Sequence, residues 1–175
     1  MCCRVGRRHV TLGFLSIDTT QWVGMAGFSV AAFLCVCVAR RGHTGWWVLA
    51  ALNALLVVEI VTGLRYRIHD LVNARLRAQG LYESRTLGQV ILIAAALVVL
   101  LAVRFKVRTQ VGSPSFHSAL TGACFAVSIF LIEAISLHDV DALLYHPVGP
   151  VLAIAFLWLA ASTWISWFAL TAQRR

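Results

Sequence analysis

The sequence predicts an all-α integral membrane protein, a bundle of about five transmembrane helices with the second extended beyond the membrane. Hydrophobic residues make up 60% of the 175 residues and charged residues only 13%, and the mean hydropathy of +0.82 is far above that of a soluble domain. The apolar residues also occur in runs of about 17 to 25, the length that crosses a bilayer. These features exclude a soluble enzyme and predict a single transmembrane domain over residues 1–175.

Five apolar runs are each expected to cross the membrane once. The first is a membrane helix and not a signal peptide, because two arginines follow it where a small-residue cleavage site would stand. Ser113 and Pro114 provide an N-cap and a first-turn proline before the fourth run, and Pro147 and Pro150 are expected to do the same before the fifth. The five predicted spans are residues 21–39, 44–64, 86–103, 118–137 and 149–171.

Small residues on the first and fifth spans are expected to permit close helix packing. They are Gly24, Gly27 and Ala31 on the first span, and Ala153, Ala160 and Ala161 on the fifth.

The net charge of +8 arises from 15 basic and 7 acidic residues, and all the basic residues but Lys106 are arginines. In a protein with several spans such an excess usually lies in short loops beside the membrane, so we expect the lipid bilayer, and no nucleic acid, as a partner. Basic residues adjoin the spans directly in the 40–43 loop, the 104–117 loop and the C-terminus. The sequence therefore predicts a protein integral to a cell membrane, with its C-terminus in the cytoplasm.

The segment after the second span has the spacing of an amphipathic helix, with apolar residues at positions 64, 68, 71, 72 and 76. No proline or glycine follows the span before Gly80, so we expect one continuous helix whose extension, residues 65–79, projects from the membrane. Polar residues would then share one stripe along the helix, formed by Glu59, Tyr66, Asp70, Asn73 and Arg77 with Thr62 and His69 at its edge.

Two glutamates lie inside the apolar runs. An ionised carboxylate at the depth of Glu59 or Glu133 costs several kcal/mol unless it is paired, hydrated or protonated. An even number of crossings separates the two residues, so both belong to the same end of the bundle. The expected orientation places this polar site on the outer face.

Other polar residues are predicted at the same end as the two glutamates. His69, His138 and Asp141 join Glu59 and Glu133 as candidates for handling protons or cations. Arg65 and Arg85 are candidates for binding an anionic headgroup or for pairing with the acids, while Asp70, Asn73 and Tyr66 are expected in supporting positions.

These residues favour a protein that moves or binds protons, cations or a small solute. Five spans enclose little space, so a path for protons or solutes across the membrane would need a homo-oligomer or a larger membrane complex. One alternative is a membrane enzyme, assisted by a metal or by acid–base groups, that acts on a lipid or polyprenyl headgroup. Another is an accessory subunit of a membrane complex. No cofactor is firmly predicted, and a metal ion would use His69, His138 and Asp141, whose spacing matches no metal-binding motif.

Overall fold

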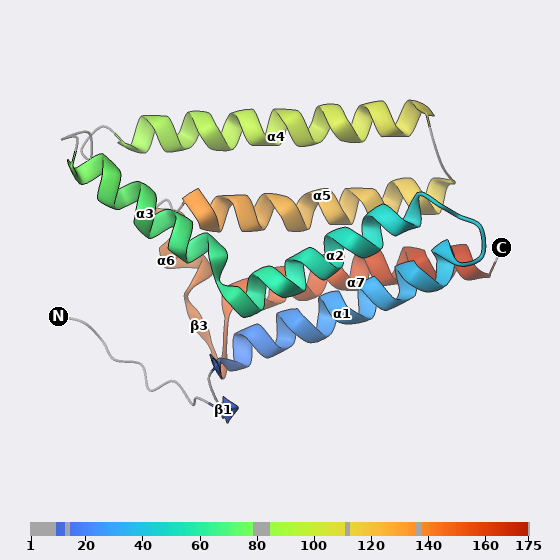
Figure 1. Cartoon of the computed structure of the whole chain (residues 1–175), viewed down its shortest axis with the longest axis horizontal. Coiled ribbons are helices and arrows are strands. Elements are labelled where there is room, and N and C mark those ends of the chain that lie inside the picture. The colour runs from blue at the N-terminus through green and yellow to red at the C-terminus, as the bar shows by residue number, and fades with distance from the viewer. Residues whose placement is uncertain (1–9, 13–14, 79–84, 111–112, 136–137, 175) are drawn as a thin grey trace.

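The structure of the chain is a computed structural model that describes residues 10–12, 15–78, 85–110, 113–135 and 138–174. Five of the described helices are long, and their axes run roughly along the length of the molecule (Figure 1). They are α1 (Thr19–Ala39), α2 (Trp46–Thr62), α4 (Arg85–Gln110), α5 (Pro114–Ile135) and α7 (Ala153–Gln173). The shorter described elements are α3 (Leu64–Ala78), α6 (His138–Leu144) and the strands β1 (Val10–Leu12), β2 (Leu15–Ile17), β3 (Pro147–Val148) and β4 (Val151–Leu152).

Four of the described helices are long and apolar enough to cross a membrane: α1, α5, α7 and the segment Gly88–Val107 of α4. The helix α2 has 17 residues, which span about 26 Å at 1.5 Å per residue, less than the hydrocarbon thickness of about 30 Å. The prediction of membrane-crossing helices is thus confirmed for four candidates by length and composition, and the second predicted span is shorter than residues 44–64.

The helix α1 packs against both α2 and α7, α7 also packs against α5, and α4 lies along α5 at one edge of the bundle (Figure 1). Two glycines of α1, Gly24 and Gly27, allow α1 and α7 to approach closely, as expected. A Cβ atom on Gly24 would lie 2.5 Å from Trp158 Cε3, and one on Gly27 would lie 2.4 Å from Ser162 Oγ. Of the other predicted small residues, Ala31 and Ala161 are buried, Ala153 is half-buried and Ala160 is exposed.

Large apolar side chains cover the outside of the helices. Phe33 on α1, Phe105 on α4 and Trp167 on α7 are each more than 60% exposed, and none of the described residues in Gly88–Val107 is buried. Such continuous apolar surfaces are rare on soluble proteins. Their extent supports a lipid bilayer as the surroundings of the bundle.

The bundle has two ends, which we call the site end and the basic end. The site end contains the start of α1, the end of α2, the helices α3 and α6, the end of α5 and the start of α7 (Figure 1). The basic end contains the end of α1, the start of α2, the end of α4, the start of α5 and the end of α7. Both predicted glutamates belong to the site end, as the number of crossings required.

The prediction of one continuous helix through the second span and its extension is wrong. Gly63 adopts the left-handed conformation, with φ 58° and ψ 34°, and its N–H donates to Glu59 O over 2.8 Å. Glycine carries no Cβ and enters this region without steric cost, so it commonly ends a helix. The extension is therefore a separate helix, α3, and the polar stripe predicted from Glu59 to Arg77 does not run along one helix axis.

We expect Gly63→Ala to lower the free energy of unfolding by about 1–2 kcal/mol, because an L residue resists the left-handed conformation. Denaturant unfolding of the detergent-purified protein measures this loss. Gly63→Asn should cost less, since asparagine tolerates this backbone region better than alanine. Equal losses in the two variants would contradict the conformational explanation.

The predicted start of the fifth span is also wrong. Pro147 and Pro150 do not begin the helix but belong to the hairpin of β3 and β4, which pairs Pro147 with Leu152 and Val148 with Val151. Gly149, with φ 64°, provides the positive backbone angle in the turn. The helix α7 consequently begins at Ala153. The N-cap predicted before the fourth span is confirmed, because Ser113 Oγ accepts from Phe116 N over 3.3 Å and Pro114 begins α5.

Candidate functional site

The turn at Gly63 brings Arg65 against Glu59. Arg65 N donates to Glu59 Oε1 over 3.2 Å, and Arg65 Nη1 forms an ion pair with Glu59 Oε2. In a continuous helix, two residues six positions apart would lie about 120° apart around the axis and about 9 Å apart along it, and could not pair in this way. The break between α2 and α3 therefore creates the first half of the site.

Glu133, near the end of α5, lies on the other side of the same guanidinium. Arg65 Nη2 is 3.3 Å from Glu133 Oε1, and the Tyr145 hydroxyl donates to that oxygen over 3.0 Å. Tyr145 directly follows α6, so three separate parts of the chain meet at Arg65 and Glu133. We call Glu59, Arg65, Glu133 and Tyr145 the acid–arginine cluster.

Two aromatic rings form an apolar wall beside the arginine. Phe130 and Trp158 are stacked, with ring centroids 5.5 Å apart and planes 4° from parallel. The guanidinium carbon of Arg65 lies 5.2 Å from the centroid of Phe130 and 5.4 Å from that of Trp158. Cation–π attraction at these distances stabilises a desolvated arginine.

The members of the cluster differ in their access to solvent. The side chain of Arg65 is 4% exposed, that of Glu133 is fully buried, and that of Glu59 is 20% exposed. Within the described residues, Glu133 Oε2 is buried and has no hydrogen-bond partner. One guanidinium thus faces two carboxylates in a largely water-free site, and the cluster carries a net charge of −1 when both acids are ionised.

The structure brings together only some of the residues predicted for this site. Glu59, Glu133 and Arg65 meet directly, and Arg65 pairs with the acids, one of the two roles proposed for it. Asp141 is half-buried on α6, whereas Asp70 is exposed on α3. The side chains of five other predicted residues lie outside the described part of the structure: Tyr66, His69, Asn73, Arg85 and His138.

Among the side chains that the structure describes, no group of three or more histidine, cysteine, aspartate or glutamate residues lies close enough to hold a metal ion. The metal site predicted from His69, His138 and Asp141 has two ligands outside the described side chains and remains a prediction.

Three residues of the site were not predicted from the sequence. Tyr145, Phe130 and Trp158 lie on segments far apart in the chain and follow no common spacing. Gly63 was the one local signal that could have revealed the Arg65–Glu59 contact, because a glycine late in a helical pattern often marks a C-cap.

Comparison of the chain with models of protein families, with curated proteins and with solved structures finds no match.

Proposed function

We propose that this membrane protein takes up and releases protons at one end of its helical bundle, through the acid–arginine cluster. The observation that carries the proposal is that two carboxylates, from Glu59 and Glu133, share the single guanidinium of Arg65. With both acids ionised, the described side chains of the cluster leave one negative charge uncompensated in a largely buried site. A buried unpaired charge costs several kcal/mol, and a bound proton or small cation removes it.

The cluster offers both a place for a proton and a way to exchange it. Glu133 Oε2 is buried and accepts no hydrogen bond from the described residues, so a proton there would displace no existing interaction. Glu59 is the partly exposed acid and is therefore the group that meets water first. In this proposal protons pass between water and Glu133 by way of Glu59, while Arg65 holds the two acids in place.

The proposed direction of transfer rests on the predicted orientation of the protein in the membrane. If the arginine-rich basic end lies in the cytoplasm, the acid–arginine cluster exchanges protons with the outer face. Complete passage across the membrane would need a path beyond this cluster, and we propose that it forms in an assembly of several copies.

Glu133→Gln is the variant that tests proton binding. Glutamine keeps the shape of the side chain and can still accept from Tyr145, but it does not exchange a proton. We expect infrared difference spectra between acidic and alkaline buffers to contain a carboxylic acid contribution from Glu133 in the wild type that is missing in Glu133→Gln. In reconstituted vesicles containing a pH-sensitive dye, proton uptake should fall by about tenfold or more.

Asp70→Asn is the matched control, because it removes an exposed carboxylate of α3 outside the cluster. It should remove only the infrared contribution of an exposed carboxyl, keep that of Glu133, and leave the proton uptake unchanged. The proposal is wrong if Glu133→Gln and Glu59→Gln both retain the carboxylic acid contribution and the wild-type uptake, since the pair would then have only a structural role.

A further inference from the structure

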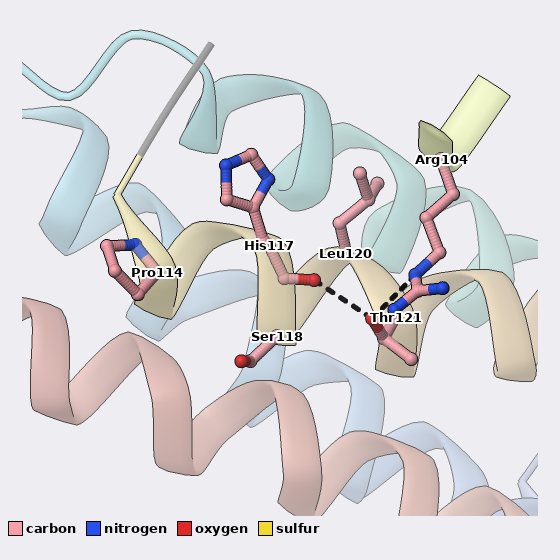
Figure 2. Close-up of a pocket in the computed structure, with 6 residues that line it drawn as sticks. All are labelled: Arg104, Pro114, His117, Ser118, Leu120 and Thr121. Atoms are coloured by element: carbon pink, nitrogen blue, oxygen red, sulfur yellow. Dashed lines mark hydrogen bonds between the residues drawn. The ribbon is translucent and has the colours of Figure 1, made fainter. Parts of the chain in front are cut away.

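The basic end of the bundle contains a cavity of about 340 Å³ between α4 and α5, within the size range of small-molecule pockets. Figure 2 shows Arg104 reaching from α4 to Thr121 on α5, with His117 one turn earlier on the same helix. The residues that line the cavity are Arg104, Pro114, His117, Ser118, Leu120 and Thr121. None of them belongs to the acid–arginine cluster.

Arg104 is held in a defined orientation. Its Nε donates to Thr121 Oγ1 over 3.0 Å, and the same hydroxyl donates to His117 O over 3.0 Å (Figure 2). No carboxylate among the described residues forms an ion pair with Arg104, and its Nη atoms have no acceptor there. A planar guanidinium fixed through Nε presents its remaining donors to a ligand in the geometry that suits phosphate oxygens.

The other polar groups of the cavity add donors to those of the arginine. His117 is half-buried, and its Nδ1 is shielded from solvent with no hydrogen-bond partner in the described part of the chain. The Ser118 hydroxyl also lines the cavity. Pro114, His117 and Ser118 belong to the first turns of α5, where the helix dipole contributes a partial positive charge.

The charge around the cavity has one sign. The described acidic residues all belong to the site end, whereas the described segments of the basic end contain only basic charged residues: Arg40, Arg41, Arg104, Lys106, Arg108 and Arg174. Arg41 already donates to Gln173 O at the end of α7, over 2.6 Å. Within the described residues no carboxylate pairs with Arg104, so its charge is available to a ligand or to the membrane surface.

We propose that this cavity binds a phosphate-bearing anion, with Arg104 as the principal ligand and His117 and Ser118 as further donors. The phosphate belongs either to the headgroup of an anionic lipid or to free phosphate, and the binding chemistry is the same for both. The proposal does not depend on proton handling at the acid–arginine cluster.

Arg104→Gln tests the proposal in the detergent-purified, delipidated full chain. Inorganic phosphate should raise the thermal unfolding temperature of the wild type when compared with chloride at equal ionic strength. The variant should bind phosphate about tenfold or more weakly, because hydrogen bonds to a charged group are lost. Native mass spectrometry tests whether a lipid headgroup binds. After incubation with mixed micelles of phosphatidic acid and phosphatidylcholine, the wild type should retain phosphatidic acid selectively.

Two further variants separate the cavity from the general charge of the basic end. Arg40→Gln removes one positive charge from an exposed position outside the cavity and should change phosphate binding by less than about twofold. Thr121→Val keeps the charge of Arg104 but removes its anchor, so binding should weaken to an intermediate degree. Circular dichroism confirms that each variant retains its helices.

Phosphatidic acid retention without a response to inorganic phosphate would support the proposal with a lipid headgroup as ligand. A response to inorganic phosphate that Arg104→Gln abolishes would support it with free phosphate. The proposal is overturned if neither probe binds, or if Arg40→Gln weakens binding as much as Arg104→Gln.

Discussion

Replacing Arg65 by glutamine is expected to lower the free energy of unfolding by about 3–5 kcal/mol. The substitution leaves Glu59 and Glu133 near each other without the guanidinium that lies between them. It also removes the cation from its place beside the stacked rings of Phe130 and Trp158. Denaturant unfolding of the detergent-purified protein, followed by the fluorescence of its six tryptophans, measures the loss.

Arg67→Gln is the matched control for this experiment. Arg67 is exposed on the same helix, α3, so its replacement removes the same charge with an expected effect within about 0.5 kcal/mol. The double variant Arg65→Gln/Glu133→Gln should recover part of the stability, because the only acid left in the cluster is the partly exposed Glu59. If Arg65→Gln is as stable as Arg67→Gln, the ion pairs do not hold this end of the bundle together.

Replacing Gly24 by alanine is expected to destabilise the contact between α1 and α7 by about 1–3 kcal/mol. The added Cβ would lie 2.5 Å from Trp158 Cε3 and 2.9 Å from Ile60 Cδ1. Trp158 is fully buried and stacked on Phe130, so its ring has little room to move. A lower thermal unfolding temperature of the variant in detergent would show the overpacking.

Gly88→Ala separates this steric effect from the general effect of replacing a helical glycine. Outside its own helix backbone, a Cβ on Gly88, in α4, meets no atom of the described residues within 4 Å. Alanine favours a helix over glycine by about 1 kcal/mol, so this variant should be as stable as the wild type or slightly more stable. Equal stability of Gly24→Ala and Gly88→Ala would contradict the close packing of α1 on α7.

Local patterns in the sequence were sufficient to predict much of the architecture. Long apolar runs predicted the helices of the bundle, because the solvation of a side chain in a bilayer depends mainly on its own polarity. The number of spans between Glu59 and Glu133 was enough to place both acids at one end. The same patterns did not predict where α2 ends or where α7 begins. Gly63 and the hairpin at Pro147 set these limits through backbone geometry that hydropathy does not reflect.

The contacts of the two polar sites could be found only in the folded chain. A helix that is apolar all round gives no sequence signal for the face that turns inward, so neither Phe130 nor Trp158 could be assigned to the wall beside Arg65. Arg104 and His117 likewise read as ordinary basic residues near a membrane surface. Their common cavity depends on how α4 packs against α5. The faces that the two helices turn toward each other are decided by contacts between residues distant in sequence rather than by the composition of either helix.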